Sequence, residues 1–207
     1  GKGWVLGETL ITGIGQGYIQ STPLQLCMMT AQIANGGYAI KPKIIVDSNP
    51  ISYEDAKQSM ESGLLFDTNS EELLDKKLFK NQKNIKIVQE AMFASTNERF
   101  GTSYKSRIDD PKYQFAGKTG TAQVKRISKR ERELDLELEQ IPYKDRDHAL
   151  YVAYGPYVNP RYALSIIVEH GGSGSKAAAP IAKKLFKLII DRHDLRNKQS
   201  NFERITV

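Results

Sequence analysis

The chain has 207 residues, which suffices for one domain with a sizeable hydrophobic core and demands no second domain. It has 30 lysine and arginine residues and 24 acidic residues, which gives a net charge of +6. The basic residues are mixed with acidic ones and accompany no nucleic-acid-binding motif, so a nucleic-acid partner is not predicted. The single cysteine, Cys27, excludes an intrachain disulfide, and the three scattered histidines lack the spacing of zinc ligands. The sequence contains no run of about twenty apolar residues, so it predicts no membrane-spanning helix.

A helix is predicted after a glycine-rich opening. Ser21 or Thr22 can act as its N-cap, and Pro23 fits its first turn. The glycine pair at 36–37 predicts its end after Asn35. Beyond it, residues 39–46 are predicted to be extended, and the polar stretch 49–81 is expected to hold a short helix at 71–79.

A second long helix precedes the middle of the chain. Its buried face is marked by apolar residues at helical spacing, which are Ile85, Val88 and Met92. A loop with Gly101, Thr102 and Ser103 follows.

Three strands are predicted in the second half, over residues 115–124, 149–154 and 162–169, with a reversal at 156–161. They form an antiparallel meander. The segment 125–147 is the most charged part of the chain. Its leucines at alternate positions, Leu134, Leu136 and Leu138, are compatible with a short strand or a mobile loop. We predict a solvated connection there.

A last helix is predicted over residues 177–190, covering the sheet. Its apolar stripe comprises Ile181, Leu185, Leu188 and Ile189. The domain is therefore expected to occupy residues 1–193, and residues 194–207 are expected to form a polar, frayed tail.

The run from Ala116 to Val124 contains the residues that are predicted to bind a ligand. Lys118 supplies a compact positive charge, Thr119 and Thr121 supply hydroxyl donors, and Gly120 leaves space for a ligand against the backbone. Strand alternation places Lys118 and Gly120 on one side and both threonines on the other. The sequence does not indicate which side faces a cleft. These features predict a carboxylate-binding strand edge.

Lys-Thr-Gly is a signature of penicillin-binding proteins and class A β-lactamases. The extended run Gly-Lys-Thr-Gly-Thr-Ala-Gln-Val is more specific than its three central residues. Further segments at 14–18, 22–26, 33–37 and 148–172 resemble class B penicillin-binding proteins, and the elongation type more than the division-specific type. The resemblance implies the α/β (α+β) transpeptidase fold, an antiparallel sheet covered by helices, present in part.

In that family a Ser-x-x-Lys nucleophile and a Ser-x-Asn triplet precede Lys-Thr-Gly. Both are expected upstream of Gly1, so the nucleophile is predicted to lie outside this chain, which alone is expected to be inactive. Two matches have the wrong context. Ser173 with Lys176 follows Lys-Thr-Gly and is predicted to cap the next helix, and Ser95 with Asn97 is predicted to end a helix.

The resemblance implies a peptidoglycan D,D-transpeptidase that β-lactams inhibit. Lys118, Thr119, Gly120 and Thr121 would bind the terminal carboxylate of a stem peptide or a β-lactam. The backbone N–H of Thr121 would be one oxyanion-hole donor. No metal or organic cofactor is expected.

The resemblance also implies a membrane glycosyltransferase and rod-shape proteins as partners, and the periplasmic face of the bacterial inner membrane as location, with an anchor outside this chain. Self-association is a further expectation, because part of a domain exposes core surface. The alternatives left open are a D-alanyl-D-alanine carboxypeptidase, a β-lactamase, a penicillin-recognising sensor module, and a non-catalytic binding piece.

Overall fold

The computed structural model describes residues 3–40, 42, 77–125, 133 and 136–205. The helices in this part of the chain are α1 (Leu6–Gly13), α2 (Pro23–Ala34), α5 (Gln82–Asn97) and α7 (Ala179–Ile205). The strands are β1 (Ala116–Ala122), β2 (His148–Gly155) and β3 (Tyr162–Val168). Short turns complete it: η1 (Tyr104–Ser106), η2 (Leu138–Gln140), η3 (Tyr143–Asp145) and the π-type turn η4 (Gly174–Ala178).

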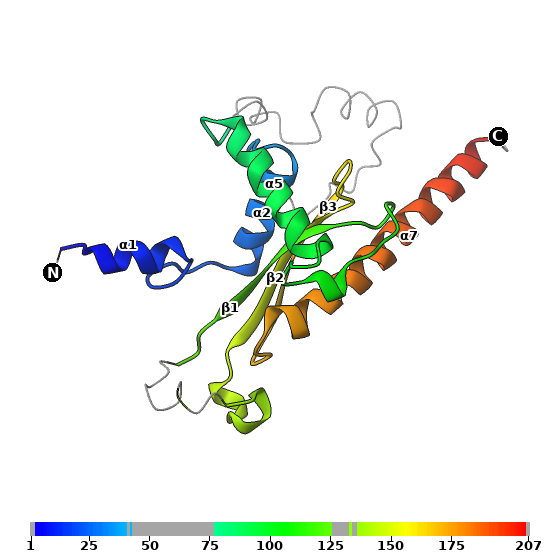
Figure 1. The fold of residues 1–207 in the computed structure, drawn as a ribbon. Coiled ribbons are helices and arrows are strands. Elements are labelled where there is room, and N and C mark those ends of the chain that lie inside the picture. The colour runs from blue at the N-terminus through cyan, green and yellow to red at the C-terminus, as the bar shows by residue number, and fades with distance from the viewer. Residues whose placement is uncertain (1–2, 41, 43–76, 126–132, 134–135, 206–207) are drawn as a thin grey trace.

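The three strands form an antiparallel sheet in the order β1-β2-β3, which confirms the predicted meander (Figure 1). Lys118 lies opposite Val152, and Thr121 lies opposite Ala149. Because β1 is at the edge, its outer side has no strand partner among the described residues. Alternate backbone N–H and C=O groups of an edge strand point away from its neighbour and can bind a ligand.

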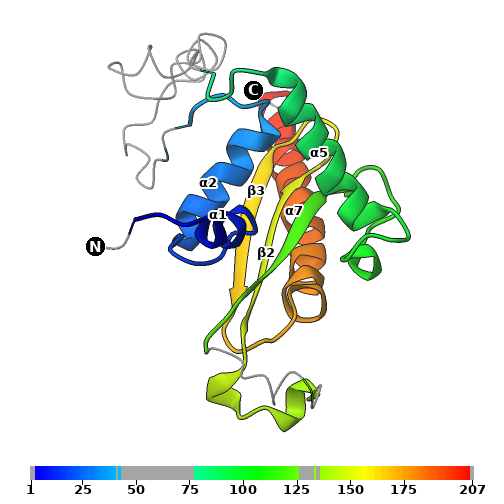
Figure 2. The same cartoon turned by 60° about the vertical axis from the view of Figure 1, so that its left-hand side comes forward.

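Helices cover both faces of the sheet (Figure 2). On one face, Ala116 and Tyr154 pack with Met92 of α5 and Ile33 of α2. On the other face, Phe115 and the alternate β2 residues pack against α7. The α/β (α+β) fold class expected from the resemblance is therefore correct.

Helix α2 begins where its cap predicts. Thr22 accepts a hydrogen bond from the Gln25 N–H at 3.2 Å, and the Gln25 side chain accepts one from the Thr22 N–H at 2.8 Å. This reciprocal pair is a capping box, which satisfies two backbone donors at the helix start. The helix ends before Gly36 and Gly37, whose φ angles of 88° and 92° suit glycine.

The buried stripe of α7 differs from the prediction. Ile181 and Leu188 are exposed, and Leu185 and Ile189 are only half-buried. The fully buried residues of α7 that pack against the sheet are Ala179, Ala182, Phe186 and Ile190. Phe186 stacks on Phe115 with ring centroids 4.9 Å apart. The small alanines let the helix lie close to the sheet, so hydrophobicity alone selected the wrong face.

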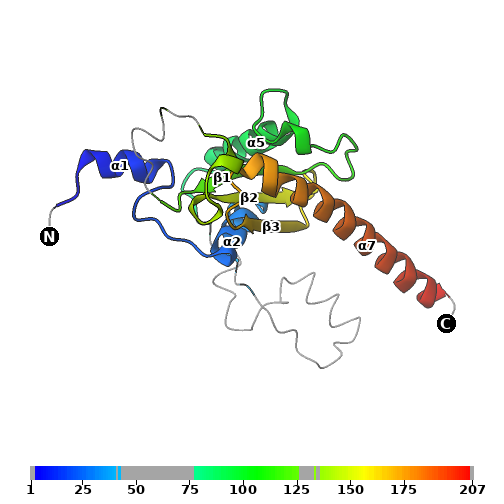
Figure 3. The ribbon, with the colours of Figure 1, turned by 90° about the horizontal axis from the view of Figure 1, so that it is seen from below.

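Helix α7 also continues well past the predicted end at residue 190 (Figure 3). Lys112 holds its middle part by ion pairs to Asp191 at 3.3 Å and Asp194 at 2.9 Å. Tyr113 also donates to Asp191, and this bond is the main reason that the Asp191 carboxyl has a lowered pKa. The Lys112 side chain similarly lowers the pKa of Asp194. These contacts anchor a polar segment that the sequence pattern left without partners.

Two other segments depart from the sequence picture. Helix α1 was not predicted, has no buried residue, and stands apart from the sheet (Figures 1 and 3). Most of the predicted segments 39–46 and 71–79 lies outside the described residues, and Lys77 forms an isolated bridge with Tyr38 rather than part of a helix. The described part of 125–147 contains two short 3₁₀ turns and no strand.

Candidate active site

The Lys-Thr-Gly run lies on β1, at the open edge of the sheet. Lys118 and Thr121 are exposed, while Thr119 and Gly120 are half-buried. Lys118 Nζ donates to the Thr119 carbonyl at 2.8 Å, so its ammonium group lies along the strand edge. The described residues bring no carboxylate to this ammonium group, which therefore keeps its charge available for an anionic ligand.

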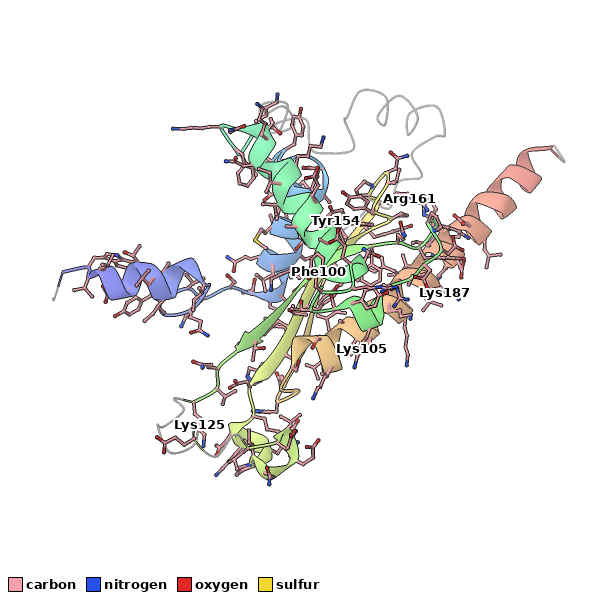
Figure 4. All side chains as sticks on the ribbon, viewed as in Figure 1. Phe100, Lys105, Lys125, Tyr154, Arg161 and Lys187 are labelled. Carbon is pink, nitrogen blue, oxygen red and sulfur yellow. The ribbon has the colours of Figure 1, made fainter. Side chains whose placement is uncertain are left out.

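Lys118 stands at an apolar pocket of about 610 Å³ between α2, α5 and the sheet. The pocket is lined by Met29 and Ile33 of α2, by residues along α5 including Met92, and by Val152 of β2. Phe100 also lines it and is 83% exposed (Figure 4). Lys118 and Val152 are register partners on one face of the sheet, so this is the side to which Lys118 points. The strand alternation left that question open.

Hydroxyl groups connect β1 to the end of α5. Thr119 Oγ1 lies 3.2 Å from Thr102 Oγ1, which in turn lies 3.2 Å from Ser95 Oγ. Thr102 and Ser95 line the same pocket as Lys118. A polar rim thus adjoins an otherwise apolar pocket, an arrangement that suits a ligand with one charged end and an apolar body.

A buried hydrogen-bond network fixes the loop beside β1. The Tyr151 hydroxyl lies 2.9 Å from Thr96 Oγ1 and 3.1 Å from Ser103 Oγ. Ser103 also donates to the Ser95 carbonyl at 3.0 Å. Burial raises the pKa of Tyr151, and its hydrogen bonds to Ser103 and Thr96 partly oppose that shift. The hydroxyl therefore stays protonated and connects β2, α5 and the loop after α5.

The tyrosine pair on β2 gives a matched prediction for stability. Tyr151→Phe should lower the free energy of unfolding by about 1–2 kcal/mol, because two buried hydrogen bonds are lost. Tyr154 is equally buried, but its hydroxyl has no hydrogen-bond partner within the described part of the chain. Tyr154→Phe should therefore unfold at or above the wild-type temperature. Thermal unfolding followed by circular dichroism measures both, and equal losses in the two variants would contradict the network.

Gly174 of η4 lies against the backbone of β1. A Cβ atom at Gly174 would lie 2.4 Å from the Leu150 carbonyl oxygen and 2.7 Å from that of Gly120. Such distances are far below van der Waals contact, so only glycine fits. The absence of a side chain at Gly174 therefore lets η4 pack directly against the backbone of the Lys-Thr-Gly strand and of β2.

Among the described residues, neither of the two misleading motif matches has a hydrogen bond between the side chains of its two motif residues. Ser173 occupies the N-cap position of η4, but the predicted capping bond is not formed, since its hydroxyl lies 2.9 Å from Ser175 Oγ and accepts from no backbone N–H at the helix start. Lys176 lines a different pocket. Ser95 and Asn97 lie in the last turn of α5, as predicted, and Asn97 donates to the carbonyls of Phe93 and Phe115 at 3.0 Å each.

Sequence reasoning missed the parts of the site that act through tertiary contacts. Thr102 was noted only as a loop residue, and neither Tyr151 nor Gly174 was singled out. A glycine in a polar loop, such as Gly174, or a tyrosine in a strand, such as Tyr151, occurs at many positions that have no functional role. Their proximity to β1 is visible only from the register of the folded sheet.

The described residues contain neither a metal-binding cluster nor a membrane-spanning helix. Within the described ranges, no three His, Cys, Asp or Glu side chains are grouped as a metal would require. In the same ranges, no helix has the length and hydropathy needed to cross a bilayer.

Curated relatives of this chain are peptidoglycan D,D-transpeptidases named MrdA. The Salmonella typhimurium protein is 32% identical over 190 residues, which cover 92% of this chain and 28% of that protein. The Haemophilus influenzae protein is 31% identical over 194 residues, covering 91% and 27%. The chain thus spans little more than a quarter of the length of these relatives.

Solved structures of PBP2 resemble this fold. Pseudomonas aeruginosa PBP2, solved in complex with WCK 5153, superposes with a TM-score of 0.65 at 33% identity, covering 90% of this chain and 34% of that one. Helicobacter pylori PBP2, solved in complex with MreC, gives a TM-score of 0.60 at 31% identity, covering 90% and 29%.

The family comparison covers almost the whole chain. Residues 1–187 match the penicillin binding protein transpeptidase domain. This match extends across α1, α2, α5, the whole sheet and the first part of α7. The chain belongs to the penicillin-binding protein transpeptidase family.

Proposed function

We propose that this chain provides the substrate-binding strand of an elongation-type peptidoglycan D,D-transpeptidase whose serine nucleophile lies upstream of Gly1. The observation that carries the proposal is the position of Lys118, Thr119, Gly120 and Thr121 on an open sheet edge beside a pocket. The D,D-transpeptidase names of the MrdA relatives support the reaction class.

Each residue of this strand has a role in the proposal. The Lys118 ammonium group pairs with the terminal carboxylate of the donor stem peptide, or with the carboxylate of a β-lactam that mimics it. Thr119 and Thr121 donate hydrogen bonds to the same carboxylate. Gly120 keeps the strand edge free of a side chain, so that the ligand lies against the backbone.

The reaction is acyl transfer. The serine attacks the carbonyl of the penultimate D-alanine, the terminal D-alanine leaves, and the acyl group passes to the amine of a second stem peptide. The backbone N–H of Thr121 stabilises the oxyanion, together with the N–H of the serine itself. One such donor contributes about 2.7–4 kcal/mol of barrier lowering in acyl-transfer enzymes.

A rigid strand is what this role requires. Oxyanion donors work because they are already in place when charge develops. The strand β1 is paired to β2 along its length, and η4 packs against it at Gly174. Thr119 contacts Thr102 in the loop after α5, and Thr102 contacts Ser95 in the last turn of α5. These contacts support preorganised binding.

The remaining proposals concern the whole protein. We place it at the periplasmic face of the bacterial inner membrane, anchored by a segment outside this chain, with a membrane glycosyltransferase and rod-shape proteins as partners. The MreC complex of the Helicobacter pylori relative supports the rod-shape partner.

Self-association of residues 1–207 is a further part of the proposal, since α1 exposes Leu6 and Leu10. A monomeric sedimentation profile at high concentration would exclude it.

The test of function is a product analysis. The protein extended upstream by its natural sequence is incubated with a stem pentapeptide, with and without an amine acceptor, and products are identified by mass spectrometry. We expect D-alanine release and a cross-linked dimer. Hydrolysed tetrapeptide alone would indicate a carboxypeptidase, rapid penicillin hydrolysis a β-lactamase, and stable acylation without peptide products a sensor module.

A further inference from the structure

A second concave surface lies on the other side of the loop after α5. Its volume is about 760 Å³, and it is bounded by that loop, η1 and the first half of α7. We call it the basic pocket. Its cationic lining residues are Arg99, Lys105, Lys176, Lys183, Lys184 and Lys187. Figure 4 shows Lys105 of η1 and Lys187 of α7 on these neighbouring elements.

Most of the positive charge of the basic pocket has no acidic partner among the described residues. No acidic side chain lines it. In the portion of the chain that the structure describes, none of the six cations forms a side-chain hydrogen bond or ion pair. Lys187 Nζ lies 5.9 Å from the centre of the Tyr113 ring, and its charge helps to lower the pKa of Asp191. The acids that follow on α7, Asp191 and Asp194, are instead bound to Lys112.

This arrangement costs stability. Lys183 and Lys187 are four residues apart on α7, and Lys184 and Lys187 are three apart, so like charges repel along one helix face. Uncompensated repulsion concentrated in one concavity indicates a surface that binds an anion.

The basic pocket adjoins the candidate active site across the loop after α5. Gly101 and Thr102 line both this pocket and the apolar pocket that holds Lys118. Thr102 also contacts Thr119 of β1 through its hydroxyl. A ligand extending from the edge of β1 can therefore pass over Thr102 into the basic pocket.

We infer that the basic pocket is a second subsite of the active site, which binds the free carboxylates of an acidic peptide. The inference rests on the proposed function, in which the substrate is a carboxylate-bearing stem peptide. Five of the six cations are lysines, which suit several separate oxygens better than the paired oxygens that arginine recognises. The concave, walled shape favours a peptide over the flat surface of a membrane.

The test uses the 207-residue chain and a fluorescein-labelled tetra-D-glutamate peptide, with binding followed by fluorescence anisotropy. The variant carries Lys105→Gln, Lys183→Gln and Lys184→Gln. Its matched control carries Lys80→Gln, Lys83→Gln and Lys86→Gln, which remove the same charge from exposed positions at or near the start of α5. We expect the Kd to rise about tenfold in the pocket variant and less than twofold in the control, and to rise with salt in the wild type.

Equal weakening in both variants would overturn the inference, because attraction would then depend on net charge alone. Binding to phosphatidylglycerol vesicles without binding to the peptide would overturn it in favour of a lipid surface. Circular dichroism checks that both variants remain folded. Penicillin acylation of the upstream-extended protein is measured separately: its failure contradicts the proposed function, while the anisotropy result still decides whether the pocket binds acidic peptides.

Discussion

Lys118→Ala should slow acylation of the upstream-extended protein by penicillin about 10- to 100-fold. In the proposed function, the change removes a charge-assisted hydrogen bond to the ligand carboxylate, and such a bond contributes about 1.5–3 kcal/mol. Lys118 is exposed and its ammonium group contacts only the Thr119 carbonyl among the described residues. The thermal unfolding of the 207-residue chain should therefore stay unchanged.

The acylation rate constant is measured by intact-mass analysis over time, at penicillin concentrations below saturation. Lys86→Ala is the matched control, because it removes an exposed lysine from α5 that lines neither pocket. Lys118→Arg should recover only part of the rate, since a planar guanidinium does not reproduce a compact ammonium group. A normal rate in Lys118→Ala would contradict the role of this strand.

Gly174→Ala should destabilise the chain by about 1–3 kcal/mol and impair acylation in the extended protein. The new methyl group would overlap the carbonyl oxygens of Leu150 and Gly120, so either η4 or β1 must move. A displacement of about 1 Å at a substrate-positioning element can cost about 100-fold in rate. Thermal unfolding and acylation kinetics measure the two effects separately.

Gly120→Ala is the control for the stability effect. Its Cβ atom would meet only Leu150 Cβ, at 3.4 Å, which is an ordinary contact. We expect its unfolding temperature to match that of the wild type. If Gly174→Ala were as stable as Gly120→Ala, the close packing of η4 against β1 would be wrong.

The sequence predicted the elements whose boundaries depend on local chemistry. The Thr22 cap and Pro23 start α2, and the glycines after Asn35 end it, because capping and positive φ are properties of a few neighbouring residues. The alternation that placed Lys118 and Thr119 on opposite sides of β1 also follows from local geometry. The register agrees with it, since Lys118 faces Val152 and Thr119 faces Tyr151.

The contacts that join distant segments could not be predicted in this way. The sheet-facing side of α7 was misassigned, because Ala182 and Phe186 fit against Phe115 only once the sheet is formed. The same holds for the hydroxyl bonds of Tyr151 to Thr96 and Ser103, which lie 55 and 48 residues away along the chain. Such contacts depend on tertiary packing, which has no local sequence signal.

The measurement that tests the central claim most directly is intact-mass analysis after incubation with a penicillin. It compares the 207-residue chain with a version extended upstream of Gly1. We predict that only the extended protein gains the mass of one penicillin, because the proposed function assigns carboxylate binding to this chain and the nucleophile to the upstream segment. Labelling of the 207-residue chain would contradict the account, since a serine within it would then be the nucleophile, and so would failure to label the extended protein.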